Sequence, residues 1–318
     1  MILEPTSYVP SLRWRMGEYQ GLLTLSSAAK DRIVPILTIP PLEFDFDTGV
    51  PRKSPHEHVF PFPKRLKAKW GTRPFWFDLH PTLRHANMNE GQSCYKYVFD
   101  EIREFGAHGI PIVSFDMDEK LIGDISSINS VDQHGLGLRV VMEDIMKPDF
   151  TATKATIVKA MGMQIDEIDL IIDLEAPNYD PIDAFSSALA GVLQGLPDLK
   201  LHRNVVLIGT SFPSSMGDIS KGVTAVKRKH WSFYNTLIAK LPNGFRTPNF
   251  GDYATVHPGF VAMDMRMIKP AGKIIYATDE NWQIIKGGSF RDNPEQMHSH
   301  AATVVNSDFY FGDNYCYG

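Results

Sequence analysis

Cysteine is scarce in this 318-residue chain: only Cys94 and Cys316 occur, far apart and without CxxC spacing. That scarcity excludes a disulfide-stabilised scaffold and a zinc site built on cysteine, and it is typical of a reducing compartment. No stretch approaches the roughly 18 consecutive apolar residues of a membrane-spanning helix. The first residues also lack the apolar run of a signal peptide. We therefore expect a cytoplasmic protein without a membrane partner.

Several functional motifs are also missing. No GxGxxG or GxxxxGK[ST] follows any apolar run, so the usual nucleotide-binding signals are absent, and Ser211 has no GxSxG context. The net charge is −5, which excludes an overall basic field that would attract nucleic acid. Two short basic stretches, 64–69 and 227–230, indicate solvated helix faces rather than phosphate contacts.

What the chain does have is a repeated alternation of strand and helix patterns. Apolar runs predict strands at 7–12, 33–39, 74–79, 110–115, 135–141, 168–174, 204–209 and 245–252. Helical patterns begin at residues 18, 93, 152, 181 and 230. In the second of these, Tyr95, Val98, Phe99, Ile102 and Phe105 recur at helical spacing, and Gly106 ends the pattern.

This alternation, with strands that are apolar throughout, predicts a parallel sheet covered by helices. Eight strands fit an α/β fold of the closed (β/α)8 TIM type, and a doubly wound open sheet is the rival. We favour the barrel because the nucleotide motifs of doubly wound sheets are absent. Residues 40–63 hold six prolines and predict a long loop after the second strand. Residues 253–290 predict a β-hairpin insertion before a last helix at 293–307, within a single barrel domain 1–318.

Acidic side chains gather where the predicted strands end. In a barrel these ends form the catalytic mouth, and residues two apart on a strand share a face. Asp78 can therefore converge with His80, and Asp173 with Glu175. We nominate Asp78, Asp173, Glu175 and Asp252 as catalytic residues. Asp78, His80, Asp173 and Glu175 also form a candidate divalent-metal set, because carboxylates with imidazole suit Mg²⁺, Mn²⁺ or Zn²⁺.

Three further residues are candidates for substrate binding: Arg13, Arg139 and Ser211. Arg139 lies near the end of an apolar strand, where a guanidinium needs either an acid of a neighbouring strand or an anionic ligand. The small residues after Ile208 leave room at the mouth, so we expect Ser211 to act as a neutral hydrogen-bonding group beside the acids rather than as a nucleophile.

Taken in order, "YVPSLRWRMGEYQGLLTL", "IVPILTIPP", "LIIDLEA", "VVLIGTSFP", "GDYATVHP" and "WQIIKGG" resemble the bacterial and phage "beta protein" family over nearly the whole chain. The resemblance implies a barrel-like fold and a role in phage–host conflict or antiviral defence. Its matching features are Arg13, Glu18, Asp173, Ser211-Phe212-Pro213 and Asp252-Tyr253. Two family features, an acid near His230 and an arginine near Ile274, are missing here, which implies an altered site.

Two functions follow from these patterns. The first is a hydrolase that cleaves a phosphoester or a glycosidic bond, with Arg13 and Arg139 binding an anionic small molecule. The second is a non-catalytic module that binds a protein or nucleic acid through the aromatic, proline-rich loop and the hairpin. The fold alone does not choose between them.

Overall fold

The computed structural model describes residues 1–259, 269–313 and 315. Cys316 and residues 260–268 of the expected hairpin insertion lie outside this part. The chain divides into two compact units. The barrel unit comprises 1–175, 191–209 and 241–254, and the second unit comprises 176–190, 210–240 and 255–318. The single-domain organisation expected from the sequence stays a prediction.

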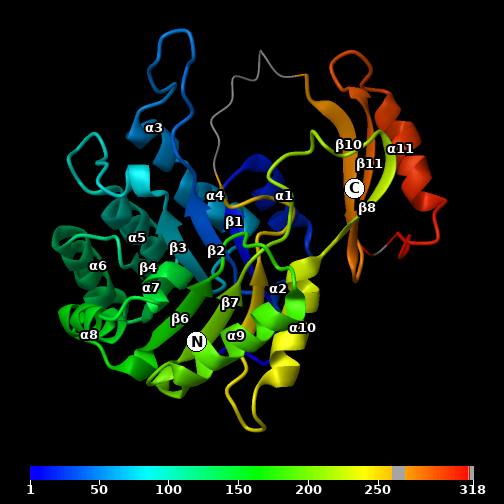
Figure 1. The fold of residues 1–318 in the computed structure, drawn as a ribbon. Helices are drawn as coiled ribbons and strands as arrows, with labels where there is room; N and C mark the ends of the chain where they lie inside the picture. The colour runs from blue at the N-terminus through cyan, green and yellow to red at the C-terminus, as the bar shows by residue number, and fades with distance from the viewer. Residues whose placement is uncertain (260–268, 314, 316–318) are drawn as a thin grey trace. The chain divides into compact units, whose positions relative to one another are not determined.

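Eight parallel strands close into a barrel in the first of these units (Figure 1). They are β1 (Val9–Arg13), β2 (Ile36–Ile39), β3 (Phe75–Leu79), β4 (Gly109–Ser114), β5 (Leu136–Val141), β6 (Ile168–Asp173), β7 (Asn204–Ile208) and β9 (Asn249–Asp252). Each coincides with a strand predicted from the sequence, and the predicted (β/α)8 fold is confirmed.

The barrel closes where β9 pairs with β1, with Val9 opposite Gly251. A Cβ atom at Gly251 would lie 2.6 Å from the carbonyl oxygen of Val9, so only glycine permits this approach. Strands β3, β6 and β7 are buried along their whole length. That burial explains why they read as continuous apolar runs in the sequence.

Helices follow the strands of the barrel unit and surround it (Figure 1). They are α1 (Met16–Thr24), α2 (Ser27–Lys30), α3 (Pro55–Val59), α4 (Phe62–Lys69), α5 (Cys94–Glu104), α6 (Glu119–Asp132), α7 (Met142–Ile145) and α8 (Phe150–Met161); α9 (Ile182–Gly195) runs from the second unit into this one. No helix in the described ranges is long and apolar enough to cross a membrane.

Helix α5 confirms the expected apolar face: Tyr95, Val98, Phe99 and Ile102 are buried, whereas Phe105 is half-buried just past the end of the helix. The prediction of a loop throughout 40–63 is wrong for α3, because Ser54 and Glu57 form a capping box that starts a helix there. The basic stretch 64–69 lies on α4, as expected.

The second unit holds an antiparallel sheet in the order β10 (Ala271–Ala277), β11 (Asn281–Ser289), β8 (Gly222–Lys227), together with α10 (Lys229–Lys240) and α11 (Gln296–Val305). The predicted hairpin is therefore present as β10 and β11. The hairpin is part of a three-stranded sheet, because β8, which no sequence pattern predicted, pairs with β11. Val304 of α11 packs with Tyr276 and Ile285 of this sheet.

A buried histidine in the barrel unit predicts that stability depends on pH. His202 is 1% exposed, and burial lowers its pKa to about 4. In the unfolded chain the His202 imidazole takes up a proton near pH 6.5, whereas in the folded chain it does so only near pH 4. The stability that neutral His202 contributes is therefore fully present above pH 6.5 and is lost as pH falls towards 4. We expect wild type to lose about 2 kcal/mol more than His202→Leu between pH 7 and about 5.

Urea unfolding of both proteins at the two pH values measures this difference. The exposed histidine His85 provides the control, because His85→Leu should keep the pH dependence of wild type. Equal losses in wild type and His202→Leu would contradict the prediction.

Candidate active site

Arg139 and Asp173 form an ion pair at the carboxyl ends of β5 and β6. The Nε of Arg139 donates to Oδ2 of Asp173 at 2.9 Å, and Nη2 donates to Asp173 as well. Tyr253, just after β9, donates its hydroxyl to the same Oδ2 at 2.5 Å. Of the two partners expected for Arg139, an acid of a neighbouring strand or an anionic ligand, the acid is present as Asp173.

Burial decides how these groups behave. The side chain of Asp173 is 1% exposed and that of Arg139 20%. Although burial alone would lower it, the pKa of Arg139 is raised well above its ordinary value by the charge of Asp173. Burial, and then Asp173, raises the pKa of Tyr253 well above its ordinary value, so its hydroxyl keeps its proton.

Asp78, at the end of β3, extends the network. Its Oδ2 lies 3.8 Å from Nη1 of Arg139 and 3.2 Å from Nη2 of Arg84. Arg84 also binds Asp116 through Nη1, at 2.8 and 2.9 Å. The hydroxyl of Tyr95, on α5, donates to Oδ1 of Asp78 at 2.6 Å. Asp78, Arg84, Asp116, Arg139 and Asp173 thus form one chain of alternating charge, which we call the mouth network.

Arg13 and Glu18 lie beside this network. Oε1 of Glu18 accepts a hydrogen bond of 3.0 Å from the backbone N–H of Arg13. The pKa of Arg13 is lowered, first by burial and then by Arg15, while Glu18 and Tyr253 oppose the shift. Burial raises the pKa of Glu18 to about 7, against the lowering effect of the Arg13 and Arg15 backbone. Glu18 is therefore the carboxyl group in the barrel unit that is poised to exchange a proton at neutral pH.

The other two nominated acids take different positions. Glu175 follows β6 with φ of 56°, a left-handed conformation held by a 2.8 Å bond from its N–H to Oδ1 of Asp173. Its side chain is exposed, and partial burial, followed by the charge of Asp173, raises its pKa. Asp252 is buried and accepts hydrogen bonds from Tyr8 and from the N–H of Ala254, which fixes the turn that carries Tyr253.

The nominated metal set does not fit a metal. No group of three His, Cys, Asp or Glu side chains within residues 1–259, 269–313 and 315 is arranged to hold an ion. Arg84 and Arg139 engage Asp78, and Arg139 engages Asp173. His80 instead caps the following turn, with Nδ1 2.9 Å from the Thr82 hydroxyl.

Ser211 belongs to the second unit, where its hydroxyl lies 3.0 Å from Nδ1 of His230. The proline-rich loop of the barrel unit exposes Phe44, Phe46 and Phe60, each between 44% and 55%. That exposure is compatible with the contact surface expected from the sequence, which stays a prediction.

No sequence pattern pointed to Arg84, and the helical pattern predicted Tyr95 only as a core residue of α5. Arg84 lies in a loop with no motif around it. Tyr95 does stand in the helical apolar pattern, so only its hydroxyl could have signalled a buried partner. Glu18 and Tyr253 came from the family resemblance alone.

The sequence model of the family described as Beta protein matches residues 8–318. The chain belongs to the Beta protein family. The residues just described therefore lie within the family's matched region. No functionally curated protein matches this family member significantly.

Solved structures similar to this Beta protein family member include triosephosphate isomerase from Bartonella henselae, with 8% identity, a TM-score of 0.38, and 78% of this chain and 93% of that one covered. The YdjI aldolase from Escherichia coli K12 has 11% identity and a TM-score of 0.34, covering 78% and 74%. The catalytic module of a family 98 glycoside hydrolase from Streptococcus pneumoniae has 10% identity and a TM-score of 0.42, covering 80% and 48%.

Proposed function

We propose that the carboxyl end of the barrel is the active site of a hydrolase that cleaves glycosidic bonds by acid–base catalysis. The raised pKa of Glu18, about 7, carries the proposal. A carboxyl group that is half protonated at neutral pH both donates a proton to a leaving oxygen and takes one from water. Hydrolysis of a glycoside needs such a general acid beside the leaving oxygen of the glycosidic bond.

Glu175 is the second carboxylate in this proposal. Its exposed side chain is available to a substrate or a water molecule, and the backbone bond to Asp173 fixes its position. Asp78 and Asp173 are positioning residues, because arginine and tyrosine donors already occupy their oxygens. Arg13 and Arg139 would donate hydrogen bonds to substrate hydroxyl groups.

Charge balance favours a glycoside over a phosphoester. The mouth network has three carboxylates and two guanidinium groups, and both guanidinium groups are engaged by those carboxylates. A phosphate would have to displace these carboxylates or be repelled by them. A neutral ligand rich in hydroxyl groups meets both donors and acceptors here without that cost.

The test is a panel of nitrophenyl glycosides assayed from pH 4 to 9 beside bis-nitrophenyl phosphate. We expect glycoside hydrolysis with one limb of the pH profile near 7, since burial raises the pKa of Glu18 to about that value. Glu18→Gln should lose about 100-fold or more in kcat/KM, and that limb should disappear.

Glu90→Gln serves as the matched control, because Glu90 is an exposed glutamate of the same unit. It should keep the wild-type profile. Hydrolysis of the phosphodiester in place of every glycoside would overturn the proposal, as would an unchanged pH profile in Glu18→Gln.

A further inference from the structure

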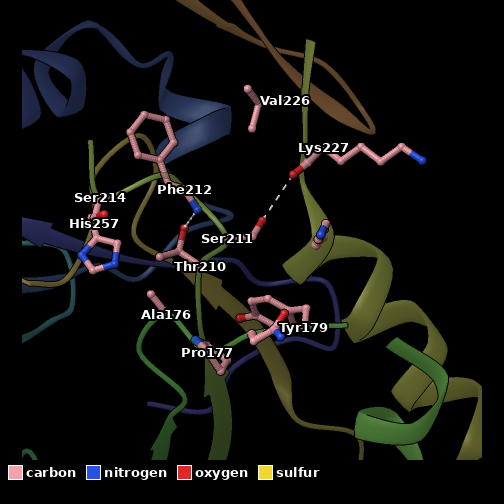
Figure 2. A pocket seen from close by; sticks show the side chains of 12 residues that line it. Ala176, Pro177, Tyr179, Thr210, Ser211, Phe212, Ser214, Val226, Lys227 and His257 are labelled. Atoms are coloured by element: carbon pink, nitrogen blue, oxygen red, sulfur yellow. Dashed lines mark hydrogen bonds between the residues drawn. The ribbon is translucent and has the colours of Figure 1, made fainter. Parts of the chain in front are cut away.

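A cavity of about 340 Å³ lies within the second unit, separate from the residues of the mouth network. Tyr179, Phe212 and Val226 give it apolar walls, and Ser211, Lys227 and Lys229 add polar groups (Figure 2). Its volume suits a small organic molecule. The residues that line it come from the segment after β6, the segment after β7, the end of β8, the start of α10 and the segment after β9.

Ser211 stands between this cavity and a buried imidazole. Its Oγ lies 3.0 Å from Nδ1 of His230, a distance that allows direct proton transfer. His230 is 2% exposed, so its ring is shielded from solvent while the serine lines the cavity. A hydroxyl held against a buried imidazole and open to a cavity is the arrangement of an activated nucleophile.

Trp282 of β11 orders both partners. The ring of His230 stacks on it with centroids 5.2 Å apart, and Phe212, next to Ser211, packs edge-on against it at 5.0 Å. The N–H of Phe212 donates to the Thr210 hydroxyl at 3.0 Å, which shapes the turn that presents Ser211 (Figure 2). The positions of hydroxyl and base are therefore set by packing rather than by a mobile loop.

Helix α10 begins at the same point. The backbone N–H of His230 points to Oγ of Ser211 at 3.4 Å, so the first turn of this 12-residue helix lies against the serine. This N–H, together with the positive end of the helix dipole, stabilises negative charge that develops on Oγ as its proton leaves.

We propose that Ser211 and His230 form a second catalytic site, which hydrolyses esters of small apolar carboxylic acids. Oγ attacks the ester carbonyl carbon while its proton passes to Nδ1 of His230. The C–O bond to the alcohol then breaks, and the alcohol leaves with that proton. Water next attacks the acyl-serine through the same base, which releases the acid and restores the hydroxyl. The missing GxSxG pattern is no obstacle, because geometry rather than sequence context defines such a pair.

The test is covalent labelling of the whole chain with an alkyl fluorophosphonate, followed by intact-mass measurement and peptide mapping. We expect one adduct, on Ser211, and none in Ser211→Ala. His230→Asn keeps an acceptor near the hydroxyl but removes the base, so labelling should slow by about 100-fold. Release of nitrophenol from nitrophenyl acetate should fall in parallel in both variants.

Ser187→Ala, an exposed serine of α9 in the same unit, is the control and should label at the wild-type rate. Near-UV circular dichroism checks that each variant is folded. Absence of an adduct, an adduct on another serine, or equal labelling rates in wild type and His230→Asn would each overturn the proposal. Glu18→Gln should label normally, so this result is independent of the glycosidase proposal.

Discussion

Replacing Asp169 by alanine is expected to cost about 3–5 kcal/mol of unfolding free energy, because it leaves the guanidinium of Arg203 without its buried partner. Asp169 is fully buried at the start of β6. Its carboxylate accepts hydrogen bonds from Trp76 at 2.9 Å, from Arg203 at 2.7 and 2.8 Å, and from Asn204 at 2.6 Å. One substitution therefore removes the acceptor of three side chains.

Urea unfolding of Asp169→Ala beside Asp31→Ala measures this cost. Asp31 pairs with Arg73 at 3.1 Å, but both side chains are substantially exposed, so that variant should lose at most about 1 kcal/mol. Arg203→Ala and the double variant complete a cycle that isolates the coupling of the pair. A loss in Asp169→Ala no larger than in Asp31→Ala would contradict the prediction.

Arg139→Gln is expected to destabilise the folded chain by about 3–5 kcal/mol at pH 7, since it leaves Asp173 and Asp78 buried without their shared guanidinium. Asp78 keeps its pair with Arg84, whereas Asp173 keeps only the Tyr253 hydroxyl and the Glu175 backbone N–H as donors. Most of the cost should therefore come from Asp173, which stays buried without a counter-charge.

Urea unfolding of this variant beside wild type at pH 7 measures the loss. Tyr253→Phe removes one donor to Asp173 and keeps the charge pair, so only about 1–2 kcal/mol should be lost. Arg73→Gln breaks a pair with Asp31 in which both side chains are substantially exposed, and it serves as the control. A loss in Arg139→Gln no larger than in Arg73→Gln would contradict the prediction.

The barrel could be predicted from the sequence because its signal is local. A strand covered on both sides, such as β6 with its run of apolar residues, is recognised without knowledge of its neighbours. Strand β8 was missed because its partner β11 lies more than fifty residues further on, and its exposed side chains give no apolar run. Helix α6 was missed although Leu121, Ile125 and Ile128 are buried at helical spacing, because serine and asparagine residues interrupt the pattern.

The candidate site was only partly predictable for a related reason. Asp78, Arg139 and Asp173 were found because charged groups at the ends of apolar strands need partners. Which partners they have depends on contacts between distant segments, as with Arg84, Tyr95 and Tyr253, and no pattern within one strand carries that information. Through such contacts Asp78 and Asp173, two of the proposed metal ligands, pair with arginine instead.

The division of the chain into two interleaved units has a consequence for fragments of the protein. The chain passes between the units after residues 175, 190, 209, 240 and 254. Neither unit is thus a continuous piece of sequence. A polypeptide stopped after Ala254 would contain all eight barrel strands yet lack Trp282, so the aromatic faces of Phe212 and His230 would lose their cover. Such a fragment would expose apolar surface and tend to aggregate. Removal of the second unit therefore requires internal deletions bridged by new linkers rather than a truncation.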